Sequence, residues 1–489
     1  MFTDHNHKMS GAQQNGDVSV MKALNLFERP NIQDAIEREY TVEYRPSEQF
    51  TDERSPVIFN IPRQSRDFTD LRSCSMKMRF KVKHKDDDTD IEDGEQVALI
   101  NMIHQTAWSQ MDVTIQGVPV SSNTRLYPYK AFFKTLTRNA GDAEDSAMKS
   151  MGWCSPYADN NDSRYDSTWL AGKRLVDGNR LLEMEGPLME DIFESERYLL
   201  NGTEMQIKLH RNLSPFMLNV HQYDAELSTP ANLGMLQTRS AAAKTAYEAD
   251  EDDEGLKATA EEALYLYNHV NGISKGYKVV LEGVVLKMAY VRVSSHVITA
   301  IQESLQQNPA LYPHTRTEMK TVAIPEGQQQ VYFDTVFSGL RPSKIVLAFV
   351  SSEGVNGSFG TDALNFEAHC VSDISIMIDG TVVQPKKLSY DEDDNAKEYV
   401  SVYMDYMSMV KKSGYQTPNV APEEFMRHPV FTFCLEPAIS GNYQHQAMKG
   451  PVSVIIQFAK ALEKSVNLMM YAETPGLMQI DAARNVAVN

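Results

Sequence analysis

Three short segments of the sequence recur at one constant distance along the chain. Val113–Val120 (VTIQGVPV) resembles Ile376–Val383 (IMIDGTVV) at an offset of 263 residues (376 − 113). At the same offset, the NIP at Asn60–Pro62 resembles the AIP at Ala323–Pro325, and TEMQIKL from Thr203 matches VNLMMYA from Val466. A self-similarity at a fixed distance indicates a duplicated structural unit. We therefore predict two domains that share one plan.

In both halves of the sequence, short runs of residues have the composition and the alternation that are typical of β-strands. In Met205–Leu209, apolar and polar residues alternate directly after the turn pair Asn201-Gly202, which is typical of a half-buried strand entered from a tight turn. All-β domains of this size close as sandwiches or barrels. We predict an all-β fold of two tandem jelly-roll β-sandwich domains, a double jelly roll, with short helices in the loops.

The predicted organisation has four parts. An N-terminal arm covers residues 1–35, the first jelly roll residues 36–225, and the second jelly roll with the C-terminal tail residues 273–489. Between the rolls, residues 226–272 are polar, acidic and rich in alanine. This composition predicts a linker or a surface insertion that is partly helical.

Two segments have helical periodicity. In YPYKAFFKTLTRN, which starts at Tyr127, apolar residues recur with the spacing i, i+3, i+4, i+7 at Tyr129, Phe132, Phe133 and Leu136. In SSHVITAIQESLQQNP, Ser295 is the predicted cap and the helix is expected to stop before Pro309.

The sequence offers no motif with a convincing catalytic or metal-binding context. Gly354–Gly360 lacks the Lys-Ser/Thr of a phosphate loop, and Ile91 occupies the position at which a calcium loop starting at Asp86 requires glycine. The aromatic residues of the first helix are expected to pack rather than to stack on bases. The histidines His104, His210, His314, His369 and His428 are isolated, and the cysteines Cys74, Cys154, Cys370 and Cys434 are read as reduced, buried thiols. We predict no enzyme, no catalytic, cofactor-binding or metal site, and no cofactor.

Charge and hydropathy restrict the class of protein further. The net charge of −19 argues against a chain whose main task is nucleic-acid binding, which requires a dominant basic face. We see no secretory leader and no run of 18 apolar residues, so we expect no membrane insertion.

Five segments of the chain stand out together by their order and spacing. They are VEYRP (Val42–Pro46), RLYPYKAFFKTL (Arg125–Leu136), FESERYLLNGTEMQIKL (Phe193–Leu209), ALYPHTRTEMKTVAIPEG (Ala310–Gly327) and YAETPGLMQIDAARNV (Tyr471–Val486). In this order and spacing they resemble the major capsid protein (hexon) of Polinton/Maverick-type elements and adintoviruses. The resemblance covers about Ile36 to Val486 and is weakest in residues 226–268.

The resemblance implies a structural protein of an icosahedral virion. Its expected partners are two further copies in a homotrimer, then neighbouring capsomers, then penton and minor capsid proteins. The shell would enclose a DNA genome without sequence-specific binding. Synthesis is expected in the host cytoplasm, and assembly in the nucleus is an open option. We expect the acidic loops Asp86–Glu95, Asp250–Glu254 and Asp391–Asp394 on the outer surface and the arm Met1–Val20 inside.

Two other hypotheses remain. A carbohydrate-binding or hydrolytic β-sandwich protein would have a concave aromatic groove with paired carboxylates and would be a monomer. A minor vertex protein, or a host-domesticated copy that no longer builds virions, is the third; a vertex protein would be expected to be shorter, with a single roll.

Overall fold

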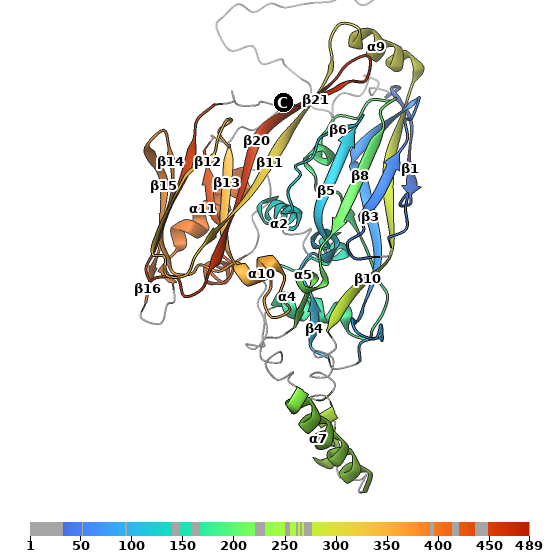
Figure 1. Cartoon of the computed structure of the whole chain (residues 1–489). Helices are drawn as coiled ribbons and strands as arrows, with labels where there is room; N and C mark the ends of the chain where they lie inside the picture. The colour runs from blue at the N-terminus through green and yellow to red at the C-terminus, as the bar shows by residue number, and fades with distance from the viewer. Residues whose placement is uncertain are drawn as a thin grey trace, which may run out of the picture.

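The chain forms two β-sandwiches that lie side by side (Figure 1). The computed structural model describes residues 33–50, 52–92, 95–138, 147–157, 167–220, 230–249, 255–260, 263–264, 267, 276–391, 396–412, 420–435 and 448–488. Most helices lie in the connections between strands.

The first sandwich consists of two four-stranded sheets, with the strand orders β1-β10-β3-β7 and β2-β8-β5-β6. In β3, Met76, Met78 and Phe80 are buried while Lys77 and Arg79 point outward, the period of two of a strand with one buried face. The strands are β1 (Ile36–Tyr44), β2 (Val57–Ile61), β3 (Asp67–His84), β5 (Trp108–Ile115), β6 (Val118–Pro119), β7 (Leu182–Pro187), β8 (Met205–Arg211) and β10 (Tyr277–Val293).

The second sandwich has the sheets β11-β20-β13-β18 and β12-β19-β14-β15, and β21 (Val486–Val488) pairs with the end of β20. Its strands are β11 (Ala310–Ile324), β12 (Gln330–Phe337), β13 (Lys344–Ser351), β14 (Val371–Ile378), β15 (Thr381–Lys387), β18 (Phe431–Cys434), β19 (Val452–Phe458) and β20 (Val466–Ile480). Two small sheets lie in connections: β4 (Val97–Leu99) with β9 (Leu218–Val220), and β16 (Ser389–Tyr390) with β17 (Ala396–Glu398).

Both sandwiches have the same topology. If the eight main strands of each are numbered in chain order, both have the order 1-8-3-6 in one sheet and 2-7-4-5 in the other. The chain therefore crosses repeatedly between the two sheets, as the jelly roll requires. This confirms the predicted all-β fold of two tandem jelly rolls.

The best of the three repeats in the sequence corresponds to one structural position. Val113–Val120 and Ile376–Val383 form the hairpins β5–β6 and β14–β15, strands four and five of each roll. Gln116 and Gly117 have φ of 53° and 77°, and Asp379 and Gly380 have 49° and 79°. Positive φ at both central residues is what a type I′ hairpin turn demands.

The other two matches do not join equivalent strands. The NIP segment ends β2, but the AIP segment ends β11, whose counterpart in the first roll is β1. The run from Thr203 contains β8, but Val466 begins β20, whose counterpart is β10. The offset is not constant because the connections of the two rolls differ in length.

Strand β10 belongs to the first sheet, although the predicted boundary at residue 273 puts it in the second roll. It pairs with β1 and β3, and its Leu286 and Met288 are buried in the first core. The hydrogen-bonded neighbours of a strand decide to which roll it belongs, and its distance from an acidic segment does not. We therefore propose that the first roll extends through Val293, so that residues 226–272 form an insertion within it.

The two predicted helices are present as α2 (Tyr127–Arg138) and α9 (Ser295–Leu305), but the N-cap of α9 is Ser294. α7 lies inside the predicted insertion and projects from one end of the body (Figure 1). The remaining helices are α1 (Ile103–Thr106), η2 (Ala147–Met151), α4 (Ser167–Val176), η3 (Asp191–Glu194), α5 (Ser214–Met217), α7 (Pro230–Ala249), α10 (Ser352–Asn356), α11 (Val400–Lys412) and α12 (Pro422–Phe425).

Several predictions concern residues outside the described ranges. The arm Met1–Val20 and the acidic loop Asp250–Glu254 lie there, as do residues 93–94 and 392–395 of the other two acidic loops. Among the described helices, none combines the length and the apolar character needed to cross a membrane.

Candidate functional site

Helix α2 is enclosed between the two sandwiches. Every residue from Tyr127 to Thr137 is buried, whereas a helix on the surface of a domain exposes one polar face. On its apolar side, the ring of Phe133 stacks on Phe366 with 5.2 Å between centroids and lies 5.8 Å from Tyr471. Both partners belong to the second roll, so the helix of one roll fills the interface with the other.

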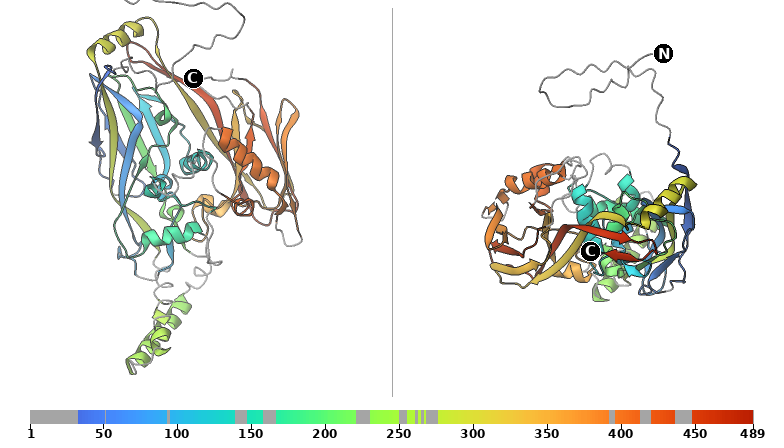
Figure 2. Two further views of the ribbon diagram at one scale, coloured as in Figure 1. Left: turned by 180° about the vertical axis from the view of Figure 1, so that it is seen from behind. Right: turned by 90° about the horizontal axis from the view of Figure 1, so that it is seen from above.

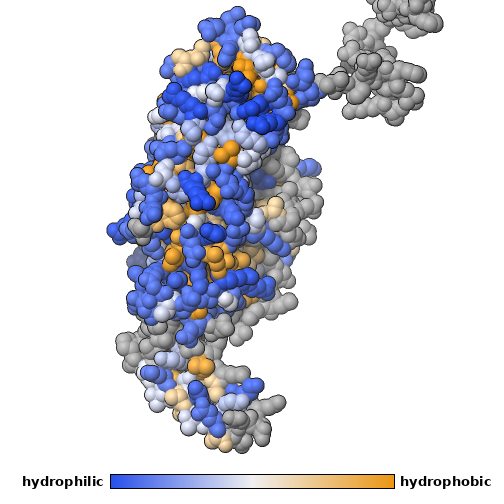
Figure 3. All heavy atoms as spheres, turned by 90° about the vertical axis from the view of Figure 1, so that its right-hand side faces the viewer, coloured by the Kyte–Doolittle hydropathy of each residue, from blue (hydrophilic) through white to orange (hydrophobic). Residues whose placement is uncertain are grey.

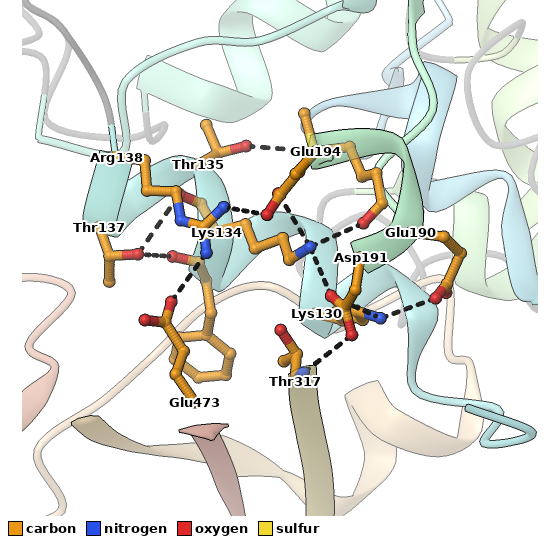
Figure 4. A network of polar contacts seen from close by, with 12 residues as sticks. Lys130, Lys134, Thr135, Thr137, Arg138, Glu190, Asp191, Glu194, Thr317 and Glu473 are labelled. Atoms are coloured by element: carbon orange, nitrogen blue, oxygen red, sulfur yellow. Dashed lines mark hydrogen bonds and ion pairs between the residues drawn. The ribbon is translucent and has the colours of Figure 1, made fainter. Parts of the chain in front are cut away.

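The polar side of α2 forms a buried network of ion pairs (Figure 4). Lys130 Nζ lies 2.7 Å from Glu190 Oε2 and 3.1 Å from Asp191 Oδ1. Lys134 Nζ lies 2.7 Å from Asp191 Oδ1 and 2.9 Å from Glu194 Oε1. The two lysines are one helical turn apart, and η3 with the residue before it supplies all three carboxylates.

Arg138 carries the network into the second roll. Its Nη1 lies 2.6 Å from Glu194 Oε2, and its Nη2 lies 3.0 Å from Glu473 Oε1 on β20. Glu473 also accepts a hydrogen bond from Tyr471 Oη at 2.5 Å and pairs with Lys344 Nζ at 3.0 Å. The named residues of the network therefore comprise four cations and four carboxylates.

A backbone contact adds to this link. The amide N–H of Thr317 on β11 donates to Asp191 Oδ2 at 2.8 Å (Figure 4). Asp191 thus binds lysines of the first roll through one oxygen and the backbone of the second roll through the other. Such a geometry ties the position of η3 to that of β11.

The pKa values show how closely the charges are balanced. Burial raises the pKa of Asp191, but Lys130 and Lys134 outweigh burial and hold it well below its usual range. Burial also acts on Glu473, yet Lys344 and Arg138 hold its pKa at about 2. The pKa of Glu190 is raised, because burial outweighs the attraction of Lys130. Carboxylates paired in this way stay ionised only while their cations remain in place.

Further contacts join the rolls outside the network. Tyr312 Oη of β11 accepts a hydrogen bond from the N–H of Leu200 at 3.1 Å. Arg484, next to β21, donates through Nε to Asn201 O at 2.8 Å and through Nη2 to Asn201 Oδ1 at 3.0 Å. The NG turn that precedes β8 is therefore held by the C-terminal segment of the second roll.

The contacts of this site hold the two rolls in position and present no reactive group. The pairs Lys130–Glu190 and Lys134–Asp191 are nearly closed to solvent, and their donors and acceptors are engaged with one another. Buried charged hydrogen bonds demand close geometry, because a misplaced partner leaves a desolvated charge. The arrangement therefore sets the orientation of one roll relative to the other.

The sequence segments rejected as sites lie apart from this network. Asp88 and Asp90 are exposed and pair with Lys278 and Lys81 on the first sheet. His104 is a core residue that contacts Met76 O at 2.7 Å, and burial lowers its pKa to about 4. No group of three or more potential metal ligands occurs among the residues described. No disulfide joins the four cysteines; Cys74 is buried as expected, but the other three are only half-buried.

An open hollow of about 450 Å³ lies beside β11 and β12. Tyr332 and Phe333 line it, and Asp334 is the single carboxylate in its lining. A glycoside hydrolase requires a pair of carboxylates across the scissile bond. The hollow therefore lacks the arrangement that the hydrolytic hypothesis demands.

Sequence reasoning missed the network, although one signal was visible. Lys130, Lys134 and Arg138 recur every fourth residue within a helix that is otherwise aromatic and apolar. Cations in such a position must find carboxylates when the helix is buried. The spacing alone could not identify Glu473, because that residue follows more than 300 positions later.

Several solved structures have an architecture similar to that of this chain. The chain is similar to the capsid protein in a quasi-atomic model of the PBCV-1 capsid, with a TM-score of 0.56, 8% identity and coverage of 94% of this chain and 98% of that one. It is similar to a chain of the Sputnik virophage, with a TM-score of 0.57, 10% identity and coverage of 98% and 94%. The fold is a double jelly roll. At such identities the likeness concerns the fold, which the Faustovirus major capsid protein shares with a TM-score of 0.50 and 8% identity over 92% of each chain.

The sequence comparisons are sparser. No protein-family model matches the chain. An uncharacterised protein of Caenorhabditis elegans is 19% identical over 398 residues, which covers 80% of this chain and 82% of that protein.

Proposed function

We propose that this chain is a structural major capsid protein whose trimers form pseudo-hexagonal capsomers of an icosahedral shell. The observation that carries the proposal is the same eight-strand order occurring twice in one chain, with the two rolls locked together by the buried network around α2. Three such chains supply six similar blocks around one three-fold axis. The fold shared with viral capsid proteins supports the same role.

The trimer contact is heterologous: the second roll of one chain meets the first roll of the next, and three such contacts close a ring. An obligate interface of this kind commonly buries ~2,000–5,000 Å². The rigid link between the rolls matters here, because a ring closes only if each chain holds its two blocks at one fixed angle.

The wider context of the proposal follows from the resemblance to hexons of Polinton/Maverick-type elements and adintoviruses. Partners would be neighbouring capsomers and penton or minor capsid proteins, around a DNA genome bound without sequence specificity. The chain would have no enzymatic role, and its place is the virion. The exposed Asp88 and Asp90 agree with an outward position of the acidic loop, where negative charge does not repel packaged DNA.

Electron microscopy of the purified full chain tests this function. Negatively stained particles with a hexagonal outline, or closed shells, are the expected result. Compact particles of single-chain size that bind glycans in an array would contradict it and favour the carbohydrate-binding hypothesis.

A second candidate is a capsid-derived copy retained by a host. The relative in an animal, Caenorhabditis elegans, is the observation that favours it. Such a protein keeps the fold and the trimer but has no virion to build. Trimers that never form shells, alone or with minor capsid proteins of a related element, are the result that this candidate predicts.

A further inference from the structure

Helices α2 and α11 occupy the same place in the two rolls. α2 lies in the connection from β6 to β7, and α11 in the connection from β15 to β18, which are strands five and six of each roll. α2 covers the outer face of the sheet β11-β20-β13-β18. In β13, the consecutive residues Ile345, Val346, Leu347 and Ala348 are all buried, so both faces of this sheet are covered.

Among the residues that the structure describes, the equivalent sheet of the first roll has one open face. In β10, Leu286 and Met288 point into the core, whereas Val285, Lys287 and Ala289 alternate with them and point outward. Figure 3 shows this side of the molecule, where apolar areas run down the middle of a mainly hydrophilic face. The charged part includes the pairs Lys77–Glu183 at 2.8 Å and Lys287–Glu185 at 2.7 Å.

Helix α11 has one open side as well. Val402 and Met409 are buried against the second roll, whereas Tyr406 contacts both rolls: its ring stacks on Phe425, and its hydroxyl donates to Leu136 O of α2 at 2.9 Å. Figure 2 shows α11 lying along the side of the second roll seen from behind. On the other side, Val400 and Met404 are 54% and 56% exposed, at the spacing of one helical turn. Met407, one turn further, is half-buried. An apolar stripe of this kind is costly to leave in water.

A second copy of this chain can cover both open surfaces. Within the part of the chain that the structure describes, α2 of the first roll covers the sheet of the second roll, whereas the outer side of α11 and the outer face of β1-β10-β3-β7 stay uncovered. We propose that the Val400–Met404–Met407 side of α11 docks onto the outer face of β1-β10-β3-β7, around Val285, in a second copy of this chain. The contact repeats the internal interface, and repeating it is what closes a ring.

The chemistry of the two surfaces agrees with this assignment. Methionine side chains adapt to an uneven surface, and the face around Val285 mixes small apolar side chains with the stems of lysines. The inference rests on the proposed function and names the two surfaces through which the chains of the proposed trimer meet.

The test uses two variants of the full chain, Met404→Asp and Val285→Asp, studied by light scattering. Each puts an unpaired charge into the proposed contact, so we expect at least a roughly 100-fold weaker association and a mass near 55.1 kDa for each variant alone. Met235→Asp on α7 is the matched control, since Met235 is 64% exposed and lies outside both surfaces; it should stay trimeric. Far-UV circular dichroism spectra like that of the wild type show that the variants fold, whereas their thermal midpoints are expected to fall because assembly stabilises the folded chain.

An experiment that mixes the two variants distinguishes the proposed contact from association through other surfaces. Each variant keeps one intact surface, so the mixture should form a two-chain complex near twice 55.1 kDa, which neither variant forms alone. Variants that remain trimeric, or variants that give no complex on mixing, overturn the assignment of surfaces. A monomeric wild-type chain instead overturns the proposed function.

Discussion

Lys134 shows how a single side chain can hold two domains in register. Its Nζ lies 2.7 Å from Asp191 and 2.9 Å from Glu194, and only 3% of its side chain is exposed. An exposed pair of this type contributes little, because water solvates the separated charges equally well. In the interface most water is excluded, so removing the cation leaves Asp191 and Glu194 with fewer cations than carboxylates around them, although Lys130 and Arg138 remain.

We expect Lys134→Met to lower the free energy of unfolding by about 3 kcal/mol, the usual cost of breaking a buried ion pair from one side. Chemical denaturation followed by far-UV circular dichroism measures the change. Lys173→Met is the control, because Lys173 on α4 pairs at 2.7 Å with Asp177, a largely exposed residue just after that helix, and the substitution should cost less than about 1 kcal/mol. Equal effects of the two substitutions would contradict the importance assigned to the network.

Glu473 gives the interface a dependence on acid. Its folded pKa of about 2 lies below the ordinary 4.5, so the stability it contributes is present above pH 4.5 and is lost as the pH falls toward 2. We expect the loss from this group to be about 3 kcal/mol. Glu190 acts with the opposite sign, because its pKa is raised.

Unfolding curves between pH 7 and pH 2 measure this dependence, with Glu473→Gln as the comparison. The variant is less stable at pH 7 but should lose less stability than the wild type on acidification. Parallel pH profiles for the two proteins would show that the carboxylate is not held ionised by Arg138 and Lys344.

At the scale of elements, the repeated hairpins depend on backbone conformation more than on packing. Gly117 has a φ of 77°, and an added Cβ would meet no atom within 4 Å, so strain in the left-handed region is the only penalty for a side chain. We expect Gly117→Ala to lower the free energy of unfolding by about 1 kcal/mol. Gly234→Ala is the matched control in helix α7, where the added Cβ is also free and should be neutral or stabilising.

Thermal unfolding of the two glycine variants decides this point. A lower midpoint for Gly117→Ala together with an unchanged or higher midpoint for Gly234→Ala is the expected pattern. Destabilisation of equal size in both would mean that the turn geometry is not what glycine provides at residue 117.

Local elements could be predicted from local signals, and pairing could not. α2 and the β5–β6 hairpin are specified by periodicity and by the turn pair Gln116-Gly117, which act over a few residues. The prediction places β10 in the second roll because it follows an acidic segment, yet its partners β1 and β3 precede it by roughly 190 to 260 residues. The alternation of apolar and polar residues in a strand shows which face is buried, but it does not identify distant pairing partners.

The same limit applies to the site. Each of its charges is ordinary in the sequence, and the network exists only because α2, η3 and β20 meet between the rolls. The aromatic residues of α2 were correctly predicted to pack, but the burial of its cationic side could not be predicted without the second roll. A helix with two buried sides is a property of the assembled pair of domains.

For the whole molecule, the decisive quantity is the number of chains in the native particle. Two rolls of one topology, held at a fixed angle, leave one open sheet face and one open helix side among the described residues of each chain. Three copies are the smallest set that gives pseudo-six-fold symmetry and closes those surfaces in a ring.

The mass of the purified full chain in solution, measured by light scattering on a sizing column, tests this directly. We expect a particle near three times 55.1 kDa, stable across dilution and moderate salt. A single species of 55.1 kDa at all salt concentrations and pH values would contradict it.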